Sequence, residues 1–112
     1  MNLRKNKKIL SKLKILDWPV TRVDVLRKAK SYKGPGLCLA IQQALLYYGL
    51  YPVRWSLSKT FPLFTRENAK RFGGDPSRLY WWPIDEWNTG RMDFLNWLIE
   101  QYKNDNTDLR KL

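Results

Sequence analysis

The sequence predicts a small, mainly helical α+β domain with a minor antiparallel sheet of two or three strands. Two ranges have the patterns of strands. Residues 53–61 alternate apolar and polar side chains, and residues 79–82 concentrate aromatic ones. The chain has 112 residues and no internal repeat or long linker, so we expect a single domain over 1–112. Apolar residues recur at helical spacing in the ranges 3–16, 22–31, 37–48 and 90–103.

The first predicted helix is basic and amphipathic. Within 3–16, Leu13 and Leu16 share a side with other aliphatic residues, and lysines occupy the opposite side. Pro19 cannot continue the helical hydrogen bonds, so the helix should end before it. We expect residues 1–18 to form a helix that either packs on the core or binds a partner.

Two more helices follow in the first half of the chain. Thr21 and Asp24 have the spacing of a capping pair, which predicts a helix over 22–31. The range 37–48 is apolar on nearly all sides, as expected for the central buried helix of a domain. Gly49 is placed to end that helix in a left-handed conformation.

The middle of the chain predicts two strands with a short helix between them. Side chains alternate over 53–61, and Pro62 ends the alternation. A helix is predicted over 65–72, because Thr65 can cap its start and glycines follow its end. The aromatic range 79–82 is the second predicted strand, and it could pair with the first.

The last third of the chain holds four of the six tryptophans and is expected to form the scaffold of the fold. Asn88 or Thr89 should cap the 90–103 helix, against which the 37–48 helix is expected to pack. Residues 104–112 are polar and are predicted to form a loose tail.

The net charge of +11 is unevenly distributed. Residues 1–33 carry eleven Lys and Arg against two Asp, a net +9, and residues 34–78 carry a net +4. Residues 79–112 have a net charge of −2. Such a basic field raises the local concentration of anionic partners, including nucleic acid and acidic protein surfaces. A role in solubility alone is the alternative.

The sequence lacks residues that several kinds of catalytic and metal-binding site need. The chain has no histidine, so it lacks the usual general base and the commonest metal ligand. Cys38 begins an apolar helix but has no histidine to activate it, and we interpret it as a packing residue. Asp85 and Glu86 are adjacent carboxylates, but a Mg²⁺ site needs further oxygen ligands that the sequence does not place. We therefore expect no catalytic residues, no metal and no cofactor.

The pattern of apolar residues and the single cysteine bear on location. No apolar run is long enough to cross a bilayer, and lysines interrupt the N-terminal apolar residues. One unpaired Cys38 favours an intracellular protein, and we expect the cytoplasm. The Met1 start suggests a complete small gene product.

Basic residues interleaved with aromatic ones suit single-stranded nucleic acid, because rings stack on bases while Lys and Arg meet phosphates. Alternatively, Trp55 belongs to the core and the charges form a solvated face. Phosphate contacts are expected from Lys and Arg within 4–33 and from Arg66 to Arg78. The candidate anion-binding residues are Lys5, Lys7, Lys8, Lys12, Lys14, Arg54, Lys59, Arg66, Lys70, Arg71 and Arg78.

Four segments of the chain combine turns with fold-forming aromatic residues: Gly36-Leu37-Cys38, Phe61-Pro62-Leu63-Phe64, Tyr80-Trp81-Trp82-Pro83 and Arg91 followed by Phe94-Leu95 and Trp97-Leu98-Ile99-Glu100. With these segments, about two thirds of the chain, from Gly36 onward, resembles small proteins of tailed bacteriophages and prophages that have no established activity. The resemblance implies an accessory protein in a bacterial host cell, of a kind that often binds host factors or defence systems. It transfers no site residue.

The function expected from these observations is non-enzymatic binding of an anionic partner, with nucleic acid or a nucleoprotein favoured. The first alternative is a protein that inhibits a bacterial host or defence factor by covering an acidic or nucleic-acid-binding surface. The second is a Mg²⁺-dependent nuclease or phosphohydrolase that uses Asp85 and Glu86.

Overall fold

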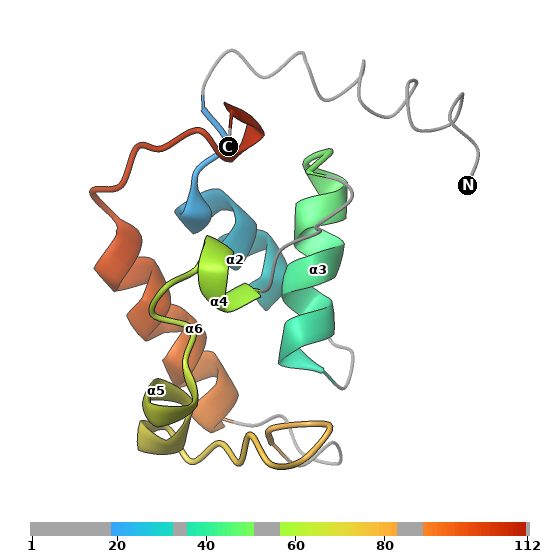
Figure 1. The fold of residues 1–112 in the computed structure, drawn as a ribbon, viewed down its shortest axis with the longest axis vertical. Helices are drawn as coiled ribbons and strands as arrows, with labels where there is room; N and C mark the ends of the chain where they lie inside the picture. Colours follow the sequence, from blue (N-terminus) through green and yellow to red (C-terminus); the bar gives the residue numbers. More distant parts are fainter. Residues whose placement is uncertain (1–18, 33–35, 51–56, 83–88, 112) are drawn as a thin grey trace, which may run out of the picture.

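Figure 1 shows the fold of the chain in a computed structural model. The structure describes residues 19–32, 36–50, 57–82 and 89–111. Outside these ranges lie the predicted helix over 3–16 and the candidates Lys5, Lys7, Lys8, Lys12 and Lys14.

The described part of the chain is helical and contains no strand, so the predicted sheet is wrong. The predicted helices over 22–31, 37–48, 65–72 and 90–103 are confirmed, with ends that shift by at most one residue. The elements are α2 (Arg22–Lys30), α3 (Leu37–Tyr47), α4 (Leu57–Thr60), α5 (Arg66–Arg71), α6 (Thr89–Tyr102) and the 3-10 helix η1 (Leu109–Lys111).

The central helix is α2, which packs against both α3 and α6 (Figure 1). Its Val25, Leu26 and Ala29 are completely buried. The small Ala29 side chain leaves room for close approach of a neighbouring helix. The expectation that α3 packs mainly on α6 is wrong, because α2 lies between these two helices and makes the main contacts with each.

The start of α2 is fixed by the predicted capping box. The backbone N–H of Asp24 donates to Thr21 Oγ1 at 3.4 Å, and the backbone N–H of Thr21 donates to Asp24 Oδ2 at 2.9 Å. Each residue satisfies a donor that the first turn of a helix cannot pair internally.

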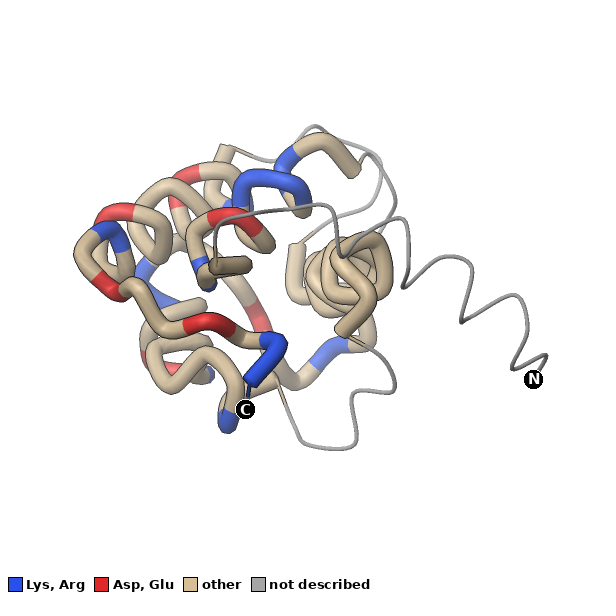
Figure 2. Tube along the Cα trace, turned by 90° about the horizontal axis from the view of Figure 1, so that it is seen from above, with Lys and Arg blue, Asp and Glu red and all other residues tan. Residues whose placement is uncertain are grey.

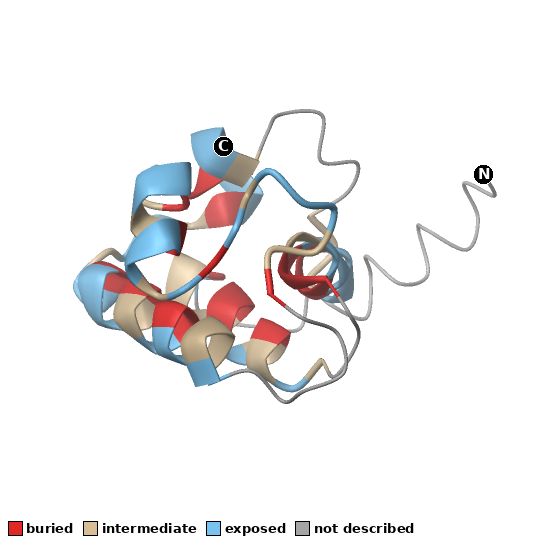
Figure 3. Ribbon diagram, turned by 90° about the horizontal axis from the view of Figure 1, so that it is seen from below, coloured by how far each residue is buried: buried red, intermediate tan, exposed pale blue. Residues whose placement is uncertain are grey.

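Helix α3 has one buried face and one exposed face, so its expected burial on all sides is wrong (Figure 3). Leu39, Leu46 and Tyr47 are exposed, Tyr47 to 52%. No charged residue lies on the helix, which is uniformly tan in Figure 2. The absence of charge therefore did not indicate complete burial.

Gly49 ends α3 as predicted. Its φ of 73° is left-handed, and its N–H donates to Leu46 O at 3.0 Å. The N–H of Leu50 donates to Leu45 O at 2.9 Å, which completes a Schellman motif.

The described part of the first predicted strand is helical instead. Residues 57–60 form α4, and the N–H of Phe61 donates to Leu57 O at 2.7 Å. Leu57 and Phe61 are four positions apart, so the apolar spacing fits one helical turn as well as a strand. Phe61 is fully buried, and the remaining residues of that prediction, including Arg54 and Trp55, lie outside the described ranges.

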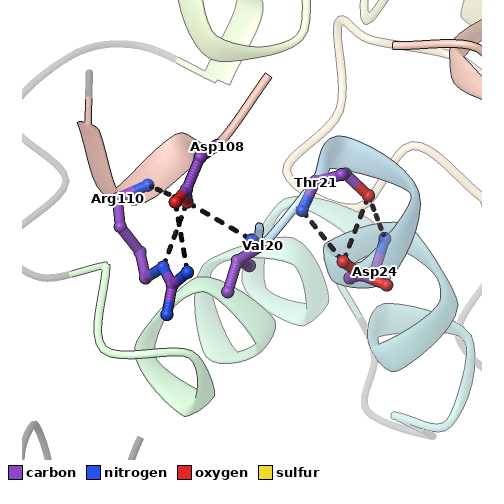
Figure 4. A network of polar contacts seen from close by, with 5 residues as sticks. All are labelled: Val20, Thr21, Asp24, Asp108 and Arg110. Atoms are coloured by element: carbon purple, nitrogen blue, oxygen red, sulfur yellow. Dashed lines mark hydrogen bonds and ion pairs between the residues drawn. The ribbon is translucent and has the colours of Figure 1, made fainter. Parts of the chain in front are cut away.

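Residues 105–111 fold back onto the start of α2, where a loose tail was predicted. The N–H of Leu109 donates to Val20 O at 2.8 Å, and both side chains are buried. Asp108 Oδ1 accepts from the Val20 N–H at 3.3 Å and from Arg110 Nε at 3.0 Å (Figure 4). Arg22 Nη1 contacts Asp105 Oδ2 at 2.6 Å.

Candidate functional site

Five of the eleven candidate anion-binding residues lie within the described ranges, and all five are exposed: Lys59, Arg66, Lys70, Arg71 and Arg78. Helix α5 brings Arg66, Lys70 and Arg71 together, and Arg78 lies on the loop that follows it. Lys59 is on α4, which Figure 1 shows apart from α5. We call Arg66, Lys70, Arg71 and Arg78 the α5 basic group.

Helix α5 is short but has defined ends. The N–H of Asn68 donates to Thr65 Oγ1 at 3.3 Å, and Ala69 faces the core without exposure. At its other end Gly73 has a φ of 82°, and the N–H of Gly74 donates to Ala69 O at 2.9 Å. The buried Ala69 orients the helix, so its cations project into solvent.

Arg71 also lies against aromatic rings. Its guanidinium carbon is 5.2 Å from the centroid of Trp97 and 5.9 Å from that of Phe72. Its Nη1 also donates to Asn68 Oδ1 at 3.4 Å. Cation–π contacts of this kind hold an arginine side chain in place without using its N–H donors, so the other donors can meet an anion.

The loop of residues 73–82 is fixed at both ends, and the strand predicted at 79–82 is absent from it. The N–H of Asp75 donates to Trp81 O at 2.7 Å, and Trp82 Nε1 donates to Phe72 O at 3.1 Å. The Trp82 ring fits closely over Gly74, where an added Cβ would lie 2.8 Å from the ring. Packing of the rings on α5 and α6 therefore takes the place of strand pairing.

A cluster of stacked rings supports this loop. Phe64 lies 4.8 Å from Trp81 at an interplanar angle of 17°, and 5.7 Å from Phe94 at 5°. Phe94 on α6 is fully buried, and Trp82 is 5.9 Å from it. Trp81 is thus held from one side by an internal stack.

Two clefts flank the segment 79–81. The first has a volume of ≈ 490 Å³ and is lined by Gly73, Asp75, Arg78, Leu79, Tyr80, Trp81 and Trp82. The second, of ≈ 300 Å³, lies toward the start of α3 and is lined by Gly36, Leu37, Cys38, Leu39, Gln42, Leu79, Tyr80 and Trp81. Leu79 is 86% exposed and lies between them.

Asp75 is the acidic residue of the first cleft, and neighbouring groups engage its carboxylate. Ser77 Oγ donates to Asp75 Oδ1 at 2.5 Å, and Arg78 Nε lies 3.2 Å from Oδ2. The hydrogen bonds from Ser77 are the main cause that lowers the pKa of Asp75, with smaller contributions from Arg78 and Lys70. The carboxylate therefore holds the turn and stays ionised.

The other candidate chemistry has little structural support. Burial raises the pKa of the Cys38 thiol, which disfavours the reactive thiolate and agrees with a packing role. Asp85 and Glu86 lie outside the described residues. Within the described ranges no group of three acidic or cysteine side chains could hold a metal, and no helix there is long and apolar enough to span a bilayer.

Sequence reasoning found the cations of α5 but missed the clefts beside Tyr80 and Trp81. The sequence predicts these rings in a strand, whereas the loop that carries them is held by the neighbouring Trp82, which packs on Gly74 and lies beside Phe94 of α6. The Asp75-Pro76 turn, with an aromatic run beginning four residues after the proline, was the one local signal of a ring-bearing loop.

Comparison with models of known protein families, with curated proteins and with solved structures gave no match.

Proposed function

We propose that the protein binds an anionic partner, single-stranded nucleic acid above all, without acting as an enzyme. The observation that carries the proposal is the α5 basic group: three exposed cations on one short helix and a fourth on the adjoining loop, next to partly exposed rings. Phosphates are recognised by such cations and bases by such rings. The basic residues preceding residue 19 and Arg54 lie outside the described ranges and stay candidates for phosphate contacts.

The resemblance to phage proteins suggests the setting. An accessory protein acting in the cytoplasm of a bacterial host would meet RNA, DNA and nucleoprotein complexes there. A high net positive charge accelerates encounters with all of them.

The experiment is fluorescence anisotropy with labelled RNA and DNA at about 50 mM and about 200 mM salt. Affinity for single strands should fall about ten-fold to a hundred-fold between the two conditions, because bound phosphates release counterions. The double variant Arg66→Gln/Lys70→Gln should reduce the slope of log affinity against log salt by about 1 to 1.5.

The matched control is Lys103→Gln/Lys111→Gln, which removes the same charge from exposed positions outside the α5 basic group. It should leave the slope almost unchanged. Absence of binding at the lower salt concentration contradicts the proposal, and equal effects of the two double variants contradict the assigned surface.

A second candidate, inhibition of a host protein, is favoured by the exposed uncharged face of α3. Leu39, Leu46 and Tyr47 are exposed on this face. Exposed apolar side chains of this kind are suited to a protein interface, where a partner covers them. Nuclease-treated bacterial lysate passed over the immobilised protein should then yield a partner that Leu46→Glu no longer captures. Capture that persists with Leu46→Glu would remove α3 from this proposal.

A further inference from the structure

We propose that the 73–82 loop receives an unstacked nucleobase of a single-stranded nucleic acid against Tyr80 and Trp81, with flanking phosphates near Lys70 and Arg78. This inference rests on the proposed function and specifies it. It assigns the rings to base contact and the cations to the backbone, so the ligand must have accessible bases.

The first support is the position of the two rings. Tyr80 and Trp81 line both clefts, so they form a shared aromatic wall between volumes of ≈ 490 Å³ and ≈ 300 Å³. Both side chains are only partly buried. A flat aromatic ligand gains most from such a wall because stacking needs a face on each partner.

The second support is that the wall is preorganised. Phe64 stacks on Trp81 at 4.8 Å, and the Trp81 carbonyl accepts a hydrogen bond from the Asp75 N–H at 2.7 Å. Gly74 and Trp82 fix the base of the loop. Trp81 therefore has little conformational freedom left to lose when a ligand binds.

The third support is the chemistry around the rings. Arg78 lines the first cleft, is exposed and pairs through Nε with the Asp75 carboxylate at 3.2 Å. Lys70 is near enough to Asp75 to lower its pKa. The Gln42 amide lines the second cleft and can both donate to and accept from a base edge. Apolar rings, an amide and flanking cations together match a nucleotide better than a purely apolar or purely anionic ligand.

The geometry also discriminates between forms of nucleic acid. Bases in a duplex are stacked and paired, so their faces are closed to a protein ring unless a base is flipped out. We therefore expect a preference for single strands, whether RNA or DNA.

The test compares labelled single strands of about ten nucleotides with an abasic strand of the same length and charge. Wild-type protein should bind the base-containing strands about 5-fold to 100-fold more tightly than the abasic strand. Tyr80→Leu should reduce that ratio strongly. Tyr80→Phe, which keeps the ring, and Leu79→Ala, which removes an exposed aliphatic neighbour, should preserve most of it.

The outcomes separate this inference from the proposed function. Equal wild-type affinity for the base-containing and abasic strands overturns base binding but leaves phosphate binding intact. No affinity for either strand overturns both. A ratio that Tyr80→Leu leaves unchanged overturns the role of the ring, and loss of the ratio in Tyr80→Phe would assign the effect to the hydroxyl instead, provided that circular dichroism shows both variants folded.

Discussion

Helix α2 and the 73–82 loop differ in how the fold uses their side chains. In α2, Val25, Leu26 and Ala29 are completely buried between neighbouring helices. In the loop the backbone is fixed at residues 74, 75 and 81, whereas Leu79 is 86% exposed and Tyr80 is partly exposed. The side chains of α2 are used for stability, and those of the loop stay accessible on a rigid support.

The difference matters because binding residues on rigid supports lose little entropy when they engage a ligand. It also predicts that substitutions in α2 mainly lower the free energy of unfolding, and that substitutions at the tip of the loop mainly lower the affinity for a ligand. Two pairs of variants test that distinction, and a third pair tests the contact of the C-terminal residues with the start of α2.

Leu26→Ala should have the largest effect, a loss of about 2 to 5 kcal/mol in the free energy of unfolding. Its side chain is completely buried, so truncation loses apolar contact and leaves a cavity. Urea denaturation measures the loss. Leu39→Ala, a truncation of the same size on the exposed face of α3, should cost less than about 1 kcal/mol. Similar costs at the two sites would contradict the central position of α2.

Gly74→Ala should lower the free energy of unfolding by about 1 to 3 kcal/mol, because a Cβ would lie 2.8 Å from Trp82 and 2.9 Å from Ala69 O. The expected displacement of Trp82 would also weaken base binding.

The matched change is Gly73→Asn, at a neighbouring glycine whose added Cβ would meet nothing within 4 Å. Asparagine adopts the left-handed conformation more readily than most residues, so this variant should cost less than about 1 kcal/mol. Denaturation curves in which Gly73→Asn is the less stable variant would argue against the close packing at Gly74.

The smallest effect should be a dependence of stability on pH at the C-terminal contact. Hydrogen bonds from Thr107 lower the pKa of Asp105, and those from Arg110 lower that of Asp108. A carboxyl with a depressed folded-state pKa stabilises the fold above its ordinary pKa of about 4, and the contribution disappears as pH falls through the folded-state value. Stability should therefore fall on acidification below about pH 4.

Thermal unfolding across that acidic range tests this expectation. Asp108→Asn should flatten the pH dependence, whereas Asp93→Asn on the exposed side of α6 should have a smaller influence. A steeper dependence in Asp108→Asn would contradict the assigned role of the carboxylate.

Local hydrogen-bonding signals predicted the helices well. Thr21 and Asp24 form the expected capping box, and Gly49 and Gly73 take the left-handed conformation beyond α3 and α5. These features depend on residues within one turn of each other, so their outcome is visible in the sequence. The exposed cations of α5 were predictable for the same reason.

The errors arose where distant contacts decide the structure. Leu57 and Phe61 fit a strand and a helical turn equally well, and the described structure forms the turn. The aromatic residues near Trp82 favoured a strand, but the ring packs on Gly74 and beside Phe94 instead. The place of α3 could not be deduced from its composition, because burial depends on which helices cover it.

The contact between Val20 and residues 108–109 affects the order in which the fold can form during synthesis. Asp108 follows Val20 by 88 positions, so α2 gains its hydrogen-bonded anchor only when nearly all of the described chain has been made. Closing so long a loop is slow compared with forming a single helix. The start of the nascent α2 therefore lacks this contact until residues 108 and 109 have been translated, and before that it relies on the Thr21–Asp24 capping box.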